Sequence, residues 1–423
     1  MKKIVCLVLS FCILFMVCGC KKPYDSGNIK RMNNASASKF STEYLKDADC
    51  LSAYGEFSFD FFNTVNKADA DKNVCLSPFS AYMAFSLCFA GSDGLTAEEF
   101  KNVFGLSKKQ AAEFCQSLYA NFIQREYSNK STKVNLANSV WIDNKYSENV
   151  KDSYLKIATD YFNAPVFRCD FSDKATVNAV NAWCKDNTDG LIDKIIEKFD
   201  ENQFMALINA LLIETAWSDE YKKNDIVKTD FTNKDLTKKE TEFLCRQISS
   251  YYLAEDAVAF KMPFKDGFSF VGILPNEDVS IDEYCNNLTA AKLSALLNNA
   301  QYDCFVNTRI PKFKIDYNVD LIGIMQTMGI NYAFNSSLAD FKPMAEIPDL
   351  NVFIGTALQK THFELDEKGV KAAAITYIGM GATSAMPEEK PPIDIFLDRP
   401  FVYILMDETA NLPMFIGTIK TIN

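Results

Sequence analysis

Hydrophobic residues recur with helical spacing in the first part of the chain. Between Leu51 and Val65, apolar side chains fall on one face of a helix. Ser77-Pro78 predicts the start of a second helix, because serine caps a helix and proline fits its first turn. This helix, Phe79–Phe89, is apolar on nearly every side and should be buried. Further helices are expected from Thr96, near Val150–Tyr161 and Ala175–Lys185, and at Thr289–Leu297 and Asn318–Met328.

Strand patterns dominate the later part of the chain. Phe204–Trp217 is apolar with little alternation, which predicts a central strand covered on both faces. Other strands are expected at Val134–Ile142, Ala257–Pro263, Phe268–Leu274, Phe305–Ile315, Val352–Leu365, Ile393–Leu397, Phe401–Asp407 and Pro413–Ile419. Helices that come first and strands that follow indicate a mixed α+β class.

Composition bounds the domain organisation and the partners. Of 423 residues, 48% are hydrophobic, and no Pro/Gly/Ser-rich seam interrupts residues 50–423. We therefore expect one large domain over 50–423, and a monomer. The net charge is −11, with acidic residues scattered along the chain. A basic nucleic-acid footprint is missing, so no nucleic-acid partner is expected.

The N-terminus has the pattern of a lipoprotein signal peptide. Lys2-Lys3 precedes an apolar run, Ile4–Val17, that is too short for a comfortable membrane span. Val17-Cys18-Gly19-Cys20 resembles a lipobox, which predicts cleavage after residue 19 and a lipid on the Cys20 thiol; an ordinary signal peptide cleaved nearby is the alternative. Residues 20–49 read as a flexible tether with a span on the order of 30 Å. The prediction is an exported bacterial lipoprotein at the cell envelope or surface, bound to the membrane through its lipid.

The remaining cysteines do not indicate a disulfide framework. Nine follow Cys20, an odd number, and many lie in apolar stretches such as Val74-Cys75-Leu76. We expect them to be mostly reduced core residues. None forms a CxxC pair, and no metal or cofactor is expected.

The sequence contains few residues or motifs that indicate an enzyme. His362 is the single histidine and lies in an alternating strand pattern, so a structural role is favoured over that of a catalytic base. HExxH, P-loop and GxGxxG motifs are missing. A hydrolase with His362 as its base remains only as an alternative.

The segment from Gly369 to Pro387 is the sharpest local feature. Small residues dominate it, and it joins two expected strands. Connections longer than about 12–15 residues inside a domain are usually functional or disordered. A flexible linker is the simpler interpretation, and a functional loop is the alternative.

Ordered motifs across the domain make this segment resemble the hinge and reactive-centre loop of the serpin family. The motifs that carry the resemblance run through residues 50–423: Asn73-Val74-Cys75-Leu76-Ser77-Pro78-Phe79-Ser80, Gly91–Thr96 with Glu99, Ala137-Asn138-Ser139, Asn181-Ala182-Trp183, Asn209-Ala210 with Trp217, Ile310-Pro311-Lys312-Phe313, Met328-Gly329-Ile330 and Asp398-Arg399-Pro400-Phe401.

The resemblance implies a fold of about nine helices and three β-sheets with an exposed reactive-centre loop. It also implies a suicide-substrate inhibitor of serine proteases rather than an enzyme, with papain-like cysteine proteases as the wider target class. The loop is cut and then inserts into the main sheet, which traps the acyl-enzyme. A non-inhibitory surface binding protein with the same fold is the alternative.

The hinge fits insertion into a sheet. Its residues, as the resemblance assigns them, are Glu367, Gly369, Val370, Ala372, Ala373, Ala374 and Thr376. Because strand side chains alternate, Val370, Ala372, Ala374 and Thr376 would share the face that slides over the core. Val370 stands where the family usually has threonine, and Lys371 where it has glutamate; Lys371 would face outward.

The resemblance also assigns a region where the sheet opens. Its residues are Ser77, Ser80, Asn209, Trp217, Lys312 and Gln359. Gln359 replaces a common histidine, and its amide is expected to bond Ser80 or Asn209. A pair between Lys312 and Glu367 is expected near the top of the sheet.

The bait bond follows from counting sixteen residues from Glu367, as in the family. This gives Thr383–Ser384, with Met380 and Met386 as alternatives. A small uncharged residue at the cut suits elastase-like or subtilisin-like proteases.

Overall fold

Seven strands form the largest sheet of the protein, hereafter the large sheet. The computed structural model describes residues 24, 27–33, 41–125, 131–200, 203–370 and 390–422. The order of strands is β1-β4-β3-β5-β15-β14-β13. Their bounds are β1 Lys30–Arg31, β3 Thr132–Asp143, β4 Val166–Cys169, β5 Met205–Ala216, β13 Phe313–Asp320, β14 Ile354–Leu365 and β15 Gly369–Val370.

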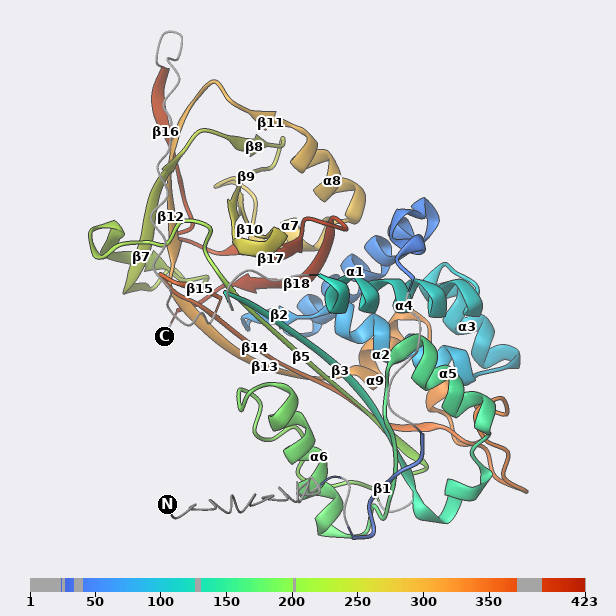
Figure 1. The fold of residues 1–423 in the computed structure, drawn as a ribbon. Helices are drawn as coiled ribbons and strands as arrows, with labels where there is room; N and C mark the ends of the chain where they lie inside the picture. The colour runs from blue at the N-terminus through green and yellow to red at the C-terminus, as the bar shows by residue number, and fades with distance from the viewer. Residues whose placement is uncertain are drawn as a thin grey trace, which may run out of the picture.

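Helices cover both faces of the large sheet (Figure 1). On one side lie α1 Ala48–Ala68, α2 Pro78–Gly91, α3 Gly94–Phe104, α4 Lys108–Gln124, α5 Asp152–Phe162 and α9 Leu321–Met328. Helix α6 (Lys174–Asn187) lies on the other side, where Val180 and Trp183 pack with Trp141 and Ile208 in a second apolar cluster. The prediction that the Phe204–Trp217 strand is covered on both faces is therefore confirmed.

The start of α2 shows how the sequence fixes local structure. Ser77 caps the helix by accepting a hydrogen bond from Ser80 N at 3.1 Å, and Pro78 occupies the first turn. All fourteen residues of α2 are buried, as the continuous apolar pattern predicts. The helix thus places Ser77 and Ser80 directly behind the large sheet.

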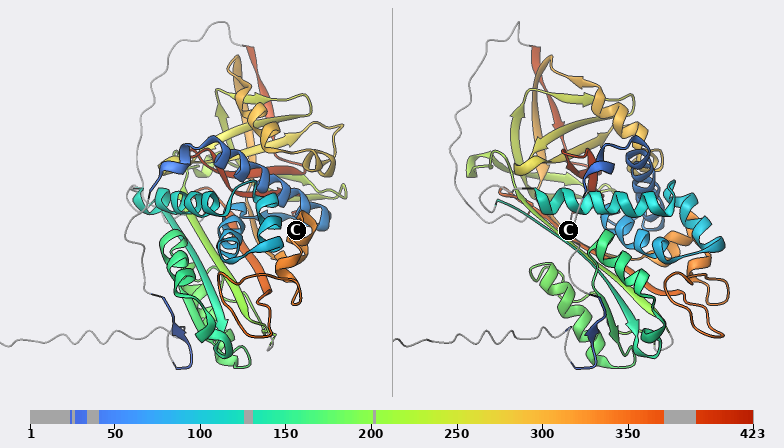
Figure 2. Two further views of the ribbon diagram at one scale, coloured as in Figure 1. Left: turned by 90° about the vertical axis from the view of Figure 1, so that its right-hand side faces the viewer. Right: turned by 45° about the vertical axis from the view of Figure 1, so that its right-hand side comes forward.

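Two further sheets form the upper part of the molecule (Figures 1 and 2). The second sheet has the order β11-β8-β9-β10-β17-β18-β2, and the third has the order β16-β12-β7-β6. The strands are β2 Val74–Leu76, β6 Ile226–Thr232, β7 Lys238–Ile248, β8 Tyr251–Leu253, β9 Ala257–Pro263, β10 Phe268–Pro275, β11 Ala300–Gln301, β12 Cys304–Pro311, β16 Lys390–Phe396, β17 Phe401–Asp407 and β18 Leu412–Ile419. Helices α7 Ile281–Asn286 and α8 Ala290–Asn298 lie beside them.

The structure departs from the sequence predictions at several elements. The predicted strand Phe305–Ile315 is two strands in different sheets, β12 and β13, separated at Lys312. Helix α4 and the hairpin β6–β7 were not predicted. The hairpin was not predicted because apolar and polar residues do not alternate along its exposed part, as in Lys238-Lys239-Glu240-Thr241-Glu242.

Part of the predicted tether contacts the domain. Lys30 and Arg31 pair antiparallel with Arg168 and Phe167 of β4, at the edge of the large sheet. The Asn33 side chain donates to Ala164 O at 2.9 Å and accepts from Val166 N at 2.9 Å. These residues depart from the prediction of a flexible linker over 20–49, since β-pairing fixes them.

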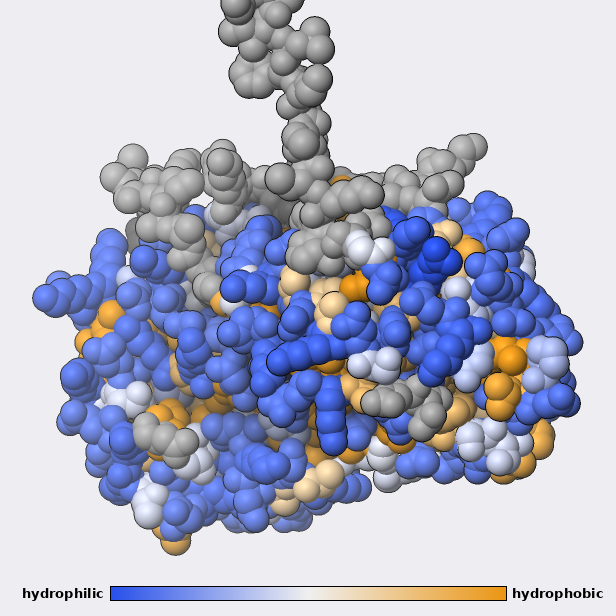
Figure 3. All heavy atoms as spheres, turned by 90° about the horizontal axis from the view of Figure 1, so that it is seen from below, coloured by the Kyte–Doolittle hydropathy of each residue, from blue (hydrophilic) through white to orange (hydrophobic). Residues whose placement is uncertain are grey.

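The lower face of the molecule is mainly hydrophilic, with apolar residues as separate spots (Figure 3). Among the described residues, no helix combines the length and the apolar character needed to cross a membrane.

Candidate functional site

A slot interrupts the large sheet between β5 and β14. The two strands pair in parallel only at their lower ends, from Ile354 opposite Met205 to Leu358 opposite Ile208. Above this point, residues 209–214 of β5 and 359–364 of β14 are all described and have no pairing with each other. The slot is six residues long, which is about 20 Å of strand.

Strand β15 closes the upper end of this slot. Val370 lies opposite Leu365 of β14 and Thr215 of β5, and β15 is antiparallel to both strands. Gly369 has φ +140°, and a Cβ there would lie 2.2 Å from Thr215 O. Only glycine fits this position, because the neighbouring backbone occupies the space of any side chain.

The turn before β15 is held by Trp217 and Tyr221. Trp217 donates from Nε1 to Asp366 O at 2.8 Å and from its backbone N to Lys368 O at 2.9 Å. Tyr221 N donates to Glu367 O at 3.1 Å. The Trp217 ring stacks on Phe264 with ring centroids 4.1 Å apart, so the anchor for the turn is itself fixed.

Lys312 connects the hinge to the third sheet. Its ammonium lies 2.7 Å from Glu367 Oε2 and 2.8 Å from Glu242 Oε2 of β7. The pair expected between Lys312 and Glu367 is present. The hydrogen bond from Lys312 lowers the pKa of the Glu367 carboxyl below its ordinary value. Glu242 was not predicted, because β7 was not.

Buried polar groups meet behind the lower end of the slot. Gln359 Nε2 donates to Ser77 O at 2.9 Å, and Gln359 Oε1 accepts from Ser77 N at 3.1 Å. Ser80 Oγ contacts Asn209 Oδ1, and Asn209 Nδ2 contacts Asn138 Oδ1. The expectation that Gln359 bonds Ser80 or Asn209 is therefore wrong: Gln359 bonds the backbone of Ser77, which leaves Ser80 to Asn209.

Two small cavities of about 10 Å³ each lie against the slot. One is bordered by Ser80, Asn209 and Gln359, and the other by Glu364 and Val370. Each is roughly the size that holds one water molecule. One cavity thus lies at the lower end of the slot and the other at its upper end.

His362 lies on β14 beside the slot. Its Nδ1 is 2.7 Å from Asp316 Oδ1, and its Nε2 is 3.6 Å from Glu364 Oε2. Both neighbours are carboxylates, and neither is the serine or cysteine that a histidine base would activate. This geometry favours the structural role over that of a base.

Several predicted site residues lie outside the described residues. They are the lipidation residue Cys20, the hinge residues Ala372, Ala373, Ala374 and Thr376, the bait residues Thr383 and Ser384, and the alternatives Met380 and Met386. Tyr221 and Asn138 belong to the site and were not assigned to it from the sequence. Asn138 could have been suspected, because Ala137-Asn138-Ser139 is one of the motifs of the resemblance.

Known proteins resemble the chain over nearly its whole length. A family model described as "Serpin (serine protease inhibitor)" matches residues 52–422. An uncharacterized serpin-like protein of Methanosarcina acetivorans is 26% identical, covering 98% of this chain and 97% of the relative. Human neuroserpin is 25% identical, covering 87% and 90%.

Among solved structures, the thermophilic serpin tengpin in its native state is similar to the chain. The identity is 30%, the TM-score is 0.80, and the match covers 92% of this chain and 97% of tengpin. The three sheets and the predominantly helical first part agree with the predicted fold, and the family as a whole supports a protease inhibitor rather than an enzyme. The chain belongs to the serpin family and has the serpin fold.

Proposed function

We propose that the protein is a suicide-substrate inhibitor of serine proteases whose bait bond is Thr383–Ser384. The nucleophilic serine of the protease attacks the Thr383 carbonyl and forms an ester with it. The Thr383–Ser384 peptide bond breaks, and Ser384 leaves as a new amine. Insertion of residues 371–376 into the slot, followed by the residues up to Thr383 as β5 and β14 separate further, then carries the acylated protease away before water reaches the ester.

The observation that carries this proposal is the slot with β15 at its upper end. Two strands already stand apart over six residues, and β15 is antiparallel to both. A strand that continued downward from Val370 would pair with β5 on one side and β14 on the other. The backbone groups of both strands that face the slot would then pair with the inserted strand.

The register of β15 predicts which side chains face the core. Continuing the pairing of Val370 with Leu365 places Ala372 opposite Phe363 and Ala374 opposite Thr361. Phe363 and Thr361 are buried, and directly paired residues share a face of the sheet. Residue 376 reaches Gln359 and Asn209 at the end of the slot. The core face therefore receives Val, Ala, Ala and Thr, which are small enough to enter.

The same register gives Lys371 specific partners. It would lie between Glu364 of β14 and Glu214 of β5. Each cross-strand pair of opposite charge stabilises by roughly 0.2–1 kcal/mol. The lysine at this position, where the family usually has glutamate, is thus matched by two carboxylates of this chain.

The target and the location belong to the same proposal. Thr383 suits elastase-like or subtilisin-like serine proteases, and papain-like cysteine proteases form the wider target class. A lipid on Cys20 would hold the inhibitor on a bacterial membrane with the domain facing outward, where foreign proteases are met.

Two hinge variants test the mechanism, because each replaces an alanine by arginine but on a different face of the inserted strand. Ala374→Arg would drive a charged side chain into the core face, whereas Ala373→Arg would place it on the outer face. Incubation with elastase or subtilisin should give a covalent band that survives SDS with the wild type and with Ala373→Arg. Ala374→Arg should be cleaved without that band. Mass mapping of the cleaved chain locates the bond.

Equal behaviour of the two arginine variants would contradict insertion. Cleavage of the wild type without a covalent band, and without a rise in melting temperature, would favour the alternative of a non-inhibitory surface binding protein.

A further inference from the structure

Two tyrosines lie on one face where β8 and β11 meet, at the edge of the second sheet. Tyr302 is 70% exposed, whereas most large apolar residues of the described chain are buried. Tyr252 is half-buried and pairs with Ala300, so it shares a face with Ala300 and Tyr302, whereas Leu253 faces the other way. Tyr252 and Tyr302 are called the Tyr302 corner below.

The backbone of the Tyr302 corner is held in place by Asn299. The Asn299 side chain donates to Leu253 O at 2.7 Å, and Leu253 N donates to Asn299 O at 3.3 Å. Gln301 Nε2 donates to Asn299 Oδ1 at 3.0 Å. Side chains that are presented from a fixed backbone lose little entropy on binding, which is the property of an efficient contact surface.

The corner lies beside the point where the chain re-enters the fold after the bait segment. Tyr302 precedes Cys304 by two residues, and Cys304 is the partner of Lys390 in the β12–β16 ladder. Figures 1 and 2 show β8, β11 and β16 at the same end of the molecule.

A protease bound at Thr383–Ser384 must come close to this corner. From Ser384 to Lys390 the chain is six residues long and can span at most about 20 Å. A protease of about 230 residues has a radius of gyration of about 17 Å. Its surface therefore extends over much of the region around Lys390.

We propose that the Tyr302 corner is an exosite for the docked protease. It would contact an apolar patch beside the part of the protease cleft that receives the residues after the cut bond. This inference rests on the proposed function. A rigid tyrosine offers a large apolar area with a polar tip, which suits a contact that forms and is released in water.

The exosite would act at one step only. The contact exists while the protease is docked on the uncut loop, and it is lost when insertion moves the protease to the other end of the large sheet. Tyr302 should therefore raise the rate of docking without changing the fraction of protease that is trapped.

The test compares Tyr302→Ser with two controls, which are Leu253→Ser on the other face of the same sheet edge and Leu236→Ser. Leu236 is 80% exposed in the turn between β6 and β7, at the end of β7 opposite to the one that leads into β8. We measure the second-order rate constant of covalent complex formation with the elastase or subtilisin that gives the complex. Tyr302→Ser should lower it about fivefold to thirtyfold. Leu253→Ser and Leu236→Ser should each leave it within about twofold.

The other outcomes separate the two proposals. If the complex forms and Tyr302→Ser changes its rate no more than Leu236→Ser, the exosite is refuted and the proposed function stands. If no protease gives a covalent complex even with the wild type, the proposed function fails first. A fall in melting temperature or in the trapped fraction would assign Tyr302 a structural role instead. A Tyr302-dependent dimer in size-exclusion chromatography would assign the surface to a second copy of the chain.

Discussion

The C-terminal corner and the slot of the large sheet differ in how their polar groups are bonded. In the C-terminal corner, formed by residues 420–422 and the loops around them, side chains and backbone groups from distant parts of the chain bond one another. In the slot, two strands stand side by side over residues 209–214 and 359–364 without pairing. The polar groups of the C-terminal corner are bonded in the native state, whereas the slot would be completed by the inserted loop under the proposed mechanism.

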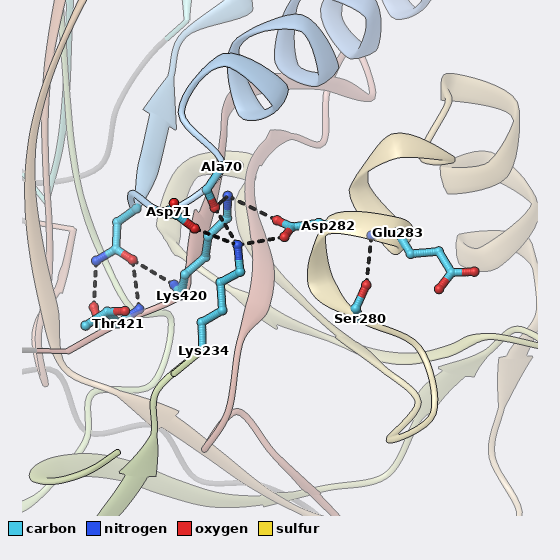
Figure 4. Close-up of polar contacts among 9 residues, drawn as sticks. Ala70, Asp71, Lys234, Ser280, Asp282, Glu283, Lys420 and Thr421 are labelled. Carbon is cyan, nitrogen blue, oxygen red and sulfur yellow. Dashed lines mark hydrogen bonds and ion pairs between the residues drawn. The ribbon is translucent and has the colours of Figure 1, made fainter. Parts of the chain in front are cut away.

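The C-terminal corner is organised around two lysines and Asp282 (Figure 4). Lys420 is fully buried; it donates to Ala70 O at 2.7 Å and lies 3.5 Å from Asp282 Oδ1. Lys234 lies 2.7 Å from Asp282 Oδ2 and donates to the same Ala70 O at 2.9 Å. Asn73 Oδ1 accepts from the backbone N of Lys420 and Thr421, at 2.7 and 3.0 Å.

The difference shows which region could lower its free energy further by a rearrangement of the fold. Burial lowers the pKa of Lys420, so its charge is costly and needs its partners. Asp282 and the carbonyl oxygen of Ala70 already stabilise this charge in the native state. A rearrangement of the fold would add no further partner to it. Under the proposed mechanism, the slot has the converse property, because insertion adds a strand ladder on both of its sides. The native state would then be held kinetically rather than at its free-energy minimum.

The largest expected effect is on the C-terminal corner. Asp282→Ala would leave the buried Lys420 ammonium without a carboxylate. Breaking a fully buried pair costs about 3–5 kcal/mol, and the Asp282 side chain is 34% exposed, so we expect a loss of about 2–3 kcal/mol in the free energy of unfolding. Urea unfolding followed by circular dichroism measures it. Asp71→Ala is the control, because Asp71 also contacts Lys234 but is 95% exposed and should cost under about 0.5 kcal/mol.

The next effect concerns the closed end of the slot. Gly369→Ala would place a Cβ 2.2 Å from Thr215 O at a φ of +140°, so β15 must shift. We expect a loss of about 1–2 kcal/mol in unfolding free energy and more cleavage without trapping. Gly323→Ala in α9 is the matched control; its Cβ meets nothing within 4 Å, and the change should stabilise slightly. Equal stability of the two variants would show that β15 contributes nothing to closing the slot.

The sequence predicted the parts of both regions that depend on local pattern. Ser77-Pro78 and the apolar run after it predicted α2 correctly, and Gly369, predicted as a hinge residue, lies at a backbone position that only glycine fits. Lys312 was recognised, but the chain passes from one sheet to another there, which strand periodicity does not reveal. The partner of Gln359 was mispredicted because Ser77 and Ser80 are both within reach of that position, and only packing decides between them. The Asp282 cluster joins residues about 350 positions apart along the chain and has no local signal at all.

A smaller effect is expected at the Lys312 clamp, and it depends on pH. Lys312→Met would free Glu367 and Glu242 and should cost about 1 kcal/mol, because all three side chains are partly exposed. Lys312 lowers the pKa of Glu367 from its ordinary 4.5. The stabilisation by the pair is therefore fully present above pH 4.5 and is lost as the pH falls through the lowered value. Stability curves should show a constant difference between variant and wild type from pH 8 to pH 6, and a shrinking one below pH 4.5. A difference that grows on acidification would contradict the clamp.

The smallest effect concerns Lys371 and is measured as the rise in melting temperature after insertion. In the extended register of β15, Lys371 would face Glu364 and Glu214, and we compare Lys371→Glu with the wild type. After cleavage, the rise in melting temperature should be smaller by roughly 1–3 °C, because like charges then face one another across the strands. Lys368→Glu makes the same charge change just before β15 and should not reduce the rise. Adding Glu364→Lys to Lys371→Glu should restore part of it, since the swap recreates one pair of opposite charges. A rise that is the same in all variants would mean that the inserted strand does not continue the register of β15, and the slot would then be completed in some other alignment.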